Sequence, residues 1–477
     1  MSPAPRSRQS PGARPALMFS ALVVPALTVV FGVWQLVWPS RATVSVIEAR
    51  ALATWPEFSA EALRSGRYTR DLELFVADHF PLRESFVGFT FALRARFGVR
   101  SSSTVYASKG GALGGFEQPQ DWSAPPTPSP EPGAPGLELL EPVVVPDEVG
   151  EAPEVVEVVE PDDAGVDVEV LPVTQKGGVL VHGGRGLMLL AANDDTARAF
   201  AKVLEAYGAA FPRVRVYAVM VPGAGAFYLP ASHKDRSADE RRNLEVMRAS
   251  LSERVTWVDV LGALEPHQRE PLYYRTDHHW TGLGAFYAAR AMVQAAGLEP
   301  LEYDALTWRT TPSPAGSLFR MTQDPQLAKE LELTTWPEPG ADVRSFSYGG
   351  ARYDVATRRS FIDERAQGYL VYLGGDAPLM AATTPVKNGR RALLVKNSFG
   401  NPLGPLLLPH FEQVVVVDYR MYFDTIAALV KRFRITDVFV QNATLTANDP
   451  YHRGRLKLAL FTPVTFVDGG VVLGRPR

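Results

Sequence analysis

One feature constrains the fold of this 477-residue chain most: after residue 177, short apolar segments alternate with helical ones. The apolar segments lie at 214–222, 254–260, 391–400, 413–420 and 435–442, and the helical ones at 237–253, 282–297 and 423–433. Strands that are apolar along their whole length are typical of a parallel sheet covered by helices on both faces. The sequence therefore predicts a three-layer α/β domain over 177–445. In such sheets the chemistry gathers at the carboxyl ends of the strands.

The amino terminus predicts a membrane anchor. Residues 1–16 carry three arginines, and an uncharged apolar run of 22 residues follows at 17–38. Signal peptides have apolar regions of about 7–15 residues, whereas a spanning helix needs about 20. We therefore expect 1–16 to stay in the cytoplasm, 17–38 to span the membrane, and the rest to be exported. The small residues at 40–42 leave a cleaved signal peptide as the alternative.

Three further segments are distinguished by composition and pattern. Residues 43–116 carry apolar residues at helical spacing and predict a helical stalk leading into the globular domain. Residues 117–176 are rich in proline, and 117–175 hold fifteen acidic residues without lysine or arginine, which predicts a disordered linker or insertion. Residues 446–477 are expected to form a C-terminal tail.

Composition excludes several classes of function. The chain has no cysteine, so disulfides, thiolate metal sites and a cysteine nucleophile are excluded. Its formal net charge of −3 gives no electrostatic reason to expect nucleic acid as a partner.

A candidate nucleophile follows the apolar segment that begins at 391. Ser398 would lie at a strand-to-helix turn, where backbone N–H groups at the start of a helix can stabilise an oxyanion. The simpler interpretation is that Ser398 caps this helix. The G-x-S-x-G pattern of α/β-hydrolases is absent, since Lys396 occupies the position of its first glycine.

The stretch "TDHHWTG" offers a base and a carboxylate. In an extended conformation Asp277 and His279 project to the same side, so the carboxylate can hold the Nδ1 proton and leave Nε2 free as a base. His278 would then point the other way and be structural, and Trp280 would pack under the imidazole. A metal site is an alternative, but the spacing lacks a helical H-x-x-x-H pattern. A purely structural loop is the other alternative.

These segments together resemble the DHHW family of bacterial exported proteins, which is similar to the SGNH-hydrolase-like alginate O-acetyltransferases. The resemblance covers most of 47–106 and 177–445 and includes "FVADHFPLRE", "YYRTDHHWTGLGAFYA", "YLGGDAPLM" and "LLVKNSFGNPLGPL". It implies an SGNH-like fold in which Asp277 and His279 supply the acid and base of a triad and Ser398 is the nucleophile. Gly375, Asn401 and Trp280 are the expected oxyanion or substrate contacts. One departure is Asn397, because the family commonly has aspartate before the serine.

The resemblance also implies a function. It predicts an O-acetyltransferase or acetylesterase, anchored in the inner membrane by 17–38, that acts on an exported polysaccharide in the periplasm or outside the cell. No cofactor or metal is expected. By analogy, a multi-pass membrane O-acyltransferase would supply the acetyl group. The alternative is a non-catalytic, membrane-tethered scaffold that binds carbohydrate or assists polysaccharide assembly.

Overall fold

The computed structural model describes two parts of the chain. It describes residues 44–45, 50–51, 55–56, 58–64, 67–80 and 103–106, then 178–467 apart from 329–331, 341 and 350–352, and finally 470–473. The chain divides into two compact units, Met1–Arg100 and Ser101–Arg477. The expected cytoplasmic tail at 1–16, the anchor at 17–38 and the linker at 117–176 lie outside the described residues. Among the residues described, no helix has the length and apolarity to cross a membrane.

The first unit contains the helix that the spacing of its apolar residues predicts. Strands β1 (Val44–Ser45) and β2 (Arg50–Ala51) pair antiparallel, and helices α2 (Ala60–Arg64) and α3 (Arg67–Asp78) follow. On α3, the Phe75 ring contacts the rings of Trp55 and His79, with centroids 5.1 Å and 4.1 Å away. Its use as a stalk stays a prediction.

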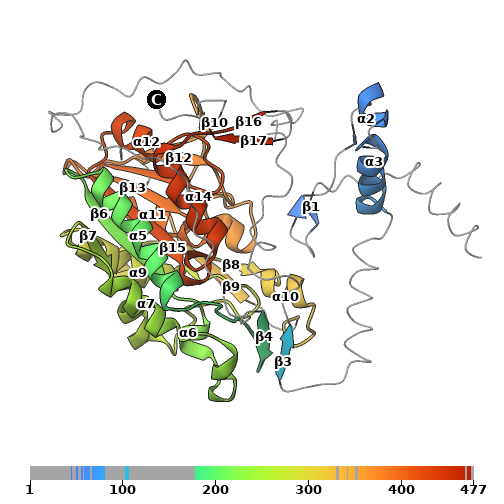
Figure 1. Ribbon diagram of the computed structural model, residues 1–477, viewed down its shortest axis with the longest axis horizontal. Helices are drawn as coiled ribbons and strands as arrows, with labels where there is room; N and C mark the ends of the chain where they lie inside the picture. The colour runs from blue at the N-terminus through green and yellow to red at the C-terminus, as the bar shows by residue number, and fades with distance from the viewer. Residues whose placement is uncertain are drawn as a thin grey trace, which may run out of the picture. The chain divides into compact units, whose positions relative to one another are not determined.

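The second unit is built on an eight-stranded sheet with the strand order β11-β10-β12-β14-β13-β15-β6-β7 (Figure 1). The strands are β6 (Arg215–Val221), β7 (Val255–Val258), β10 (Arg344–Gly349), β11 (Val355–Arg358), β12 (Leu379–Thr383), β13 (Arg391–Lys396), β14 (Gln413–Asp418) and β15 (Asp437–Ala443). The run from β14 to β7 is parallel and comprises the strands that the sequence predicts. The remaining strands, β12, β10 and β11, extend it with antiparallel pairs.

The sheet is thus mixed, and the expectation of a wholly parallel sheet is correct only in part. The antiparallel strands β10 and β11 lie at one edge, and most of their residues are exposed or half-buried. An edge strand that faces solvent does not need the continuous apolar run by which buried parallel strands are recognised. Their sequences therefore gave no strand signal.

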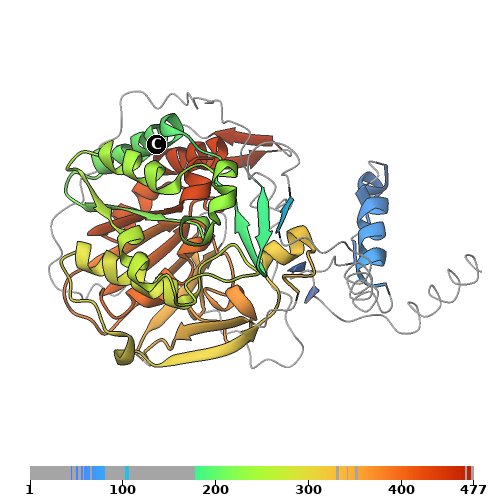
Figure 2. The same cartoon turned by 90° about the horizontal axis from the view of Figure 1, so that it is seen from below.

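Helices cover both faces of the sheet, as the three-layer prediction requires (Figure 2). One face packs against α5 (Asp194–Ala210), α7 (Glu240–Ala249), α12 (Ile426–Arg432) and α14 (Pro450–Phe461). The other packs against α8 (Val260–Leu264), α9 (Gly282–Ala295) and α11 (Leu403–Leu407). Neighbouring residues of β6 point to opposite faces of the sheet. Ala218 packs in the core on the α5 side and Val219 in the core on the α9 side. This alternation follows from the two-residue period of a strand.

Part of the expected C-terminal tail belongs to the core. Asp449 caps α14 by accepting a hydrogen bond from the His452 amide. Leu456 and Leu460 of this helix are buried and pack in the same core as α5. Arg453, Arg455 and Lys457 interrupt the apolar pattern of this helix in the sequence, so residues 450–461 differ from the tail that we expected.

Smaller elements frame the carboxyl ends of the central strands. Strands β8 (Trp308–Ser313) and β9 (Glu332–Pro337) form an antiparallel pair, with the short helix α10 (Ser317–Thr322) between them. A 3-10 helix, η5 (Gly368–Val371), packs beside β9. A three-stranded sheet contains β3 (Ser103–Tyr106), β4 (Val179–His182) and β5 (Arg185–Met188). Much of this frame comes from 303–370, a stretch without a clear sequence pattern.

Candidate active site

Ser398 lies where the sequence predicts, at the turn that follows β13. The strand ends at Lys396, and Ser398 begins the 3-10 helix η6 (Ser398–Gly400), which leads to α11. The turn is closed by Asn397, whose side-chain oxygen accepts a hydrogen bond from the Phe399 amide at 3.1 Å. Because Asn397 rather than the serine caps the turn, the Ser398 hydroxyl is available for another contact.

The loop that carries the two histidines is bent instead of extended. Tyr273 and Trp280 form a β-bridge across it, and the Tyr274 amide donates to the His279 carbonyl at 3.2 Å. Thr281 ends the loop as the N-cap of α9. The bend brings residues 277–279 together at the carboxyl end of the sheet.

Three of the predicted site residues form one chain of hydrogen bonds. Ser398 Oγ lies 2.8 Å from Nε2 of His279, and Nδ1 of the same ring lies 2.7 Å from Oδ1 of Asp277. Ser398 and His279 are largely buried, with 7% and 8% of their surfaces exposed. The contact joins residues 119 positions apart in the sequence. The arrangement is that of a serine, a base and an orienting carboxylate.

The surroundings of Asp277 keep its carboxylate ionised. Burial alone would raise its pKa, but attraction to His279 and hydrogen bonds from His279 and the Ser317 amide hold the pKa well below its usual value. The Ser317 amide donates to Oδ2 at 2.7 Å, while Oδ1 also accepts the His279 amide at 3.0 Å. An ionised carboxylate can only accept, so Nδ1 of a neutral His279 carries the proton and Nε2 faces Ser398 as an acceptor.

The rings around His279 differ from those expected. Tyr369 of η5 stacks on the imidazole with centroids 3.9 Å apart and an interplanar angle of 8°. His278 lies 3.8 Å away at 37°, and Phe399 4.9 Å away at 54°. Trp280 is fully buried and its indole N–H donates to the Phe399 carbonyl at 2.9 Å. Trp280 therefore supports the serine turn through its single donor, and its contact with a substrate stays a prediction.

His278 does not point away from His279, which corrects the expectation from an extended chain. Its Nδ1 lies 2.5 Å from the Ser317 hydroxyl and 3.5 Å from Asp277 Oδ1. The bend of the loop removes the alternation of side chains that an extended strand would give. His278 thus belongs to the same cluster.

The expected donors of an oxyanion hole are engaged within turns. The amides of Gly400 and Asn401 donate to the carbonyls of Asn397 and Ser398, and the Phe399 amide donates to Asn397. The Gly375 amide donates to the Tyr372 carbonyl at 3.0 Å. The Asn401 side chain donates to Asp376, and its buried oxygen has no hydrogen-bond partner among the described residues. These donors thus have partners within the protein, and the contact of Gly375 and Asn401 with an oxyanion or substrate stays a prediction.

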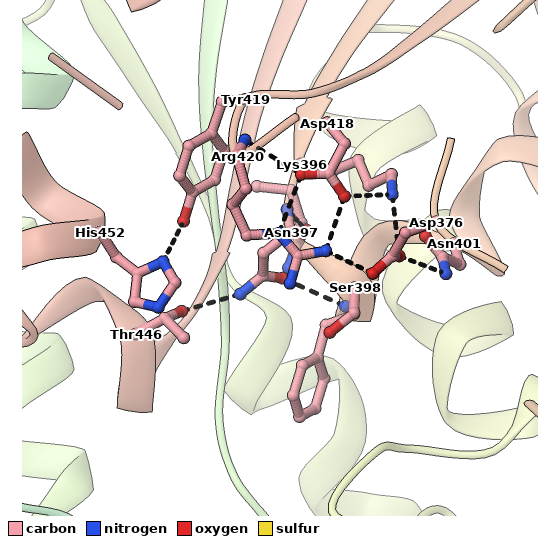
Figure 3. Close-up of polar contacts among 12 residues, drawn as sticks. Asp376, Lys396, Asn397, Ser398, Asn401, Asp418, Tyr419, Arg420, Thr446 and His452 are labelled. Carbon is pink, nitrogen blue, oxygen red and sulfur yellow. Dashed lines mark hydrogen bonds and ion pairs between the residues drawn. The ribbon is translucent and has the colours of Figure 1, made fainter. Parts of the chain in front are cut away.

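A group of four charged side chains lies next to the serine turn (Figure 3). Lys396, at the end of β13, is fully buried and pairs with Asp418 at 2.8 Å, while Arg420 contacts Asp418 at 2.6 Å and Asp376 at 2.8 Å. Burial alone would raise the pKa of Asp376, but Arg420 and Lys396 hold it well below its usual value. Asp376 also accepts the Asn401 amide group at 3.0 Å. These contacts tie both ends of the turn to the neighbouring strand.

Asn397, the departure from the family pattern, is matched to its surroundings (Figure 3). Its amide nitrogen donates to the side-chain oxygens of Asn442 at 2.9 Å and Thr446 at 2.7 Å. The side chain is fully buried. An aspartate here would lose both donors and would place a charge among acceptors.

We therefore expect Asn397→Asp to destabilise the protein by about 3 kcal/mol or more, the usual cost of an unpaired buried polar or charged group. Urea unfolding followed by circular dichroism measures the loss, with Asn388→Asp as the control because Asn388 is exposed. A stability equal to that of the wild type at pH 7 would contradict this account.

The cluster of one carboxylate and two imidazoles around the candidate base is also the candidate for a metal site. Asp277, His278 and His279 each offer a ligand atom, and these atoms lie within 4.8 Å of one another. An ion among them would have to displace the hydrogen bond between Asp277 and His279. The ionised carboxylate is already satisfied by that bond and by Ser317, which favours the hydrogen-bonded arrangement.

The sequence missed several side chains that shape the site. Ser317, from α10, contacts both Asp277 and His278. Tyr369 covers His279, and Glu332 of β9 accepts hydrogen bonds from the amides and hydroxyl of the loop at 275–276. All three come from 303–370, and no spacing or motif marks them.

The fold and the site together define a class: a three-layer α/β protein with a serine, a histidine and an aspartate joined at the carboxyl end of its sheet. The sequence model described as DHHW protein matches residues 141–417, more than half of the chain. The chain therefore belongs to the DHHW family. A comparison with curated proteins finds no match.

Solved structures with a similar fold include one from the same family. The DHHW family protein from Eubacterium siraeum is 28% identical, with a TM-score of 0.54, and the match covers 61% of this chain and 98% of that one. PatB1 from Bacillus cereus, in its structure with a sulfonyl adduct, is 16% identical with a TM-score of 0.49 over 60% and 98%. The O-acetyltransferase domain of Pseudomonas putida AlgJ is 15% identical with a TM-score of 0.32 over 59% and 99%. The last two likenesses are too distant to bear on the activity of this chain.

Proposed function

We propose that this DHHW protein is an SGNH-like serine acyltransferase or esterase. The observation that carries the proposal is the unbroken chain of hydrogen bonds from Ser398 through His279 to Asp277. A hydroxyl alone is a weak nucleophile, and an oriented neutral imidazole activates it. A binding scaffold has no need for such a contact, so the geometry supports the enzyme over the scaffold.

The proposed reaction has two steps. In the first, Ser398 Oγ attacks the carbonyl carbon of an acyl donor while His279 Nε2 takes the hydroxyl proton and then passes it to the leaving group. In the second, an acceptor hydroxyl gives its proton to His279 and attacks the acyl-serine, which releases the acyl product and restores Ser398. A sugar hydroxyl as acceptor gives transfer, and water gives hydrolysis.

Each remaining residue has a defined part in this reaction. Asp277 holds the ring in the productive tautomer and stabilises the imidazolium that forms in both steps. The Ser317 amide fixes the second oxygen of Asp277. The rings of Tyr369 and Phe399 exclude water from the imidazole, which strengthens its interaction with the carboxylate.

The finer part of the proposal rests on the resemblance of the motifs to alginate O-acetyltransferases. We infer that the acyl group is acetyl, that the acceptor is an exported polysaccharide, and that residues 17–38 hold the enzyme in the inner membrane with its active site outside the cytoplasm. A multi-pass membrane O-acyltransferase would deliver the acetyl group.

The direct test is to trap the acyl-enzyme. We expect the full-length protein in detergent, mixed with an aryl acetate and quenched in acid, to carry acetyl on the peptide that contains Ser398, as read by mass spectrometry. His279→Asn should abolish this acetylation. Acetyl that appears equally in both proteins, or on other peptides alone, would overturn the serine mechanism. A metal-dependent reaction would instead be blocked by a chelator without any acetyl-serine.

A further inference from the structure

Tyr369 contacts both members of the reactive pair. Its ring lies parallel to the His279 imidazole, with centroids 3.9 Å apart. Its hydroxyl donates to the backbone carbonyl of Ser398 at 2.9 Å. One side chain thus sets the plane of the base and the position of the nucleophile's backbone.

The second face of the imidazole is also covered. His278 lies with its ring centroid 3.8 Å from that of His279. Two rings cannot both lie within 4 Å of the same face, so Tyr369 and His278 contact opposite faces. The imidazole is therefore confined between two rings and keeps freedom mainly to rotate in its own plane. That rotation is opposed by the hydrogen bond to Asp277.

Tyr369 is itself held firmly. It lies on η5, beside the buried cluster formed by Trp336, Ile362, Val371 and Tyr372. The rings of Tyr274 and Tyr372 contact it edge-on, at 6.4 Å and 5.4 Å. A side chain fixed in this way can impose a geometry on its neighbours, which a mobile one cannot.

We propose that Tyr369 is a positioning residue of the acyl-transfer site, which couples the orientation of His279 to the position of Ser398. This proposal rests on the proposed serine mechanism. The ring also lowers the energy of the protonated state that His279 passes through, because an aromatic face attracts a cation. The two effects act on the chemical step and not on substrate binding.

The test separates the ring from the hydroxyl. Tyr369→Phe keeps the stacked ring and loses the hydrogen bond, and we expect kcat to fall about 5-fold, the effect of a typical single hydrogen bond. Tyr369→Leu loses both, and we expect kcat to fall about 100-fold, as for a misplaced catalytic group. KM for an aryl acetate should change little in either variant. Tyr372→Phe is the matched control, because it removes a buried hydroxyl that bonds the Thr335 carbonyl.

A second readout needs no turnover. Phenylmethanesulfonyl fluoride modifies an activated serine by forming an O–S bond as fluoride leaves and the hydroxyl proton passes to the base. We expect labelling of Ser398 in the full-length protein to slow in the order wild type, Tyr369→Phe, Tyr369→Leu. Equal labelling rates in all three proteins would overturn the proposal. A rise in KM alone would also overturn it and would assign Tyr369 to substrate contact. If the leucine variant does not fold, the phenylalanine variant decides by the same criterion.

The two proposals can fail separately. The nitrogen signals of His279, observed by NMR after selective labelling of the histidines and assigned with His279→Asn, report its tautomer and hydrogen bonds without any reaction. A wild-type protein that is never labelled at Ser398 contradicts the serine mechanism. A His279 signal that is the same in the wild type and in Tyr369→Leu contradicts the positioning role, whatever the activity.

Discussion

Ser398→Ala is expected to lower the turnover of an aryl acetate by at least about 10⁴-fold, because it removes the atom that forms the acyl-enzyme. The replacement is small and the site is buried, so the fold should be unaffected. Initial rates with the full-length protein, measured beside circular dichroism, give the result. Any residual rate should match the uncatalysed reaction with an added histidine.

The chain offers a matched control in a second serine–histidine contact. Ser232 Oγ lies 2.9 Å from Nδ1 of His233 on the exposed surface. Ser232→Ala removes a similar hydrogen bond away from the described site, and we expect the turnover to stay at the wild-type value. Equal rates in wild type and Ser398→Ala would exclude Ser398 as the nucleophile.

Asp277→Asn is expected to reduce kcat by about 10⁴-fold, the size typical of this replacement in a serine triad. Asp277 accepts three hydrogen bonds, from Nδ1 and the amide of His279 and from the Ser317 amide. The asparagine side chain has only one acceptor oxygen, so at least one of these N–H donors faces the NH₂ group, which is itself a donor. The ring can then relax to the other tautomer, which leaves Nε2 unable to take the serine proton.

Asp239→Asn is the control for Asp277→Asn. Asp239 caps α7 by accepting the Arg242 amide, and asparagine caps a helix equally well. We expect unchanged kcat in this variant. Because the pKa of Asp277 lies well below its usual value, the wild type should keep the orienting charge throughout the acidic range in which the protein is folded. A kcat for Asp277→Asn within a few-fold of the wild type would show that the carboxylate is dispensable.

Most of the strands that the sequence predicts are buried on both faces of the sheet. Strand β12 is buried in the same way, but its short apolar run was not recognised. The strands β6, β13, β14 and β15 read as apolar runs because helices cover both sides. The strands β10 and β11 were missed because solvent replaces one of those layers. Helix α14 was missed because charged residues interrupt its buried face.

The same distinction applies to the candidate site. Asp277, His279 and Ser398 are marked by local context, a short polar motif and a serine directly after an apolar strand. The predicted direction of the His278 side chain is wrong because the prediction assumes an extended loop. The β-bridge between Tyr273 and Trp280 bends this loop. Ser317 and Tyr369 come from distant segments with ordinary sequences. Their role is created only by the tertiary contacts of the frame around the sheet.

The charged group beside the serine turn limits how this region can change in evolution. Lys396, Asp376, Asp418 and Arg420 balance one another, and replacing one leaves a buried charge without its counterpart, at a cost of about 3–5 kcal/mol. Substitutions at these positions are therefore tolerated mainly as coordinated pairs. Lys396, two residues before the candidate nucleophile, is thus coupled to residues on two other segments, and a serine placed at this turn in another protein would need the whole charged group beside it.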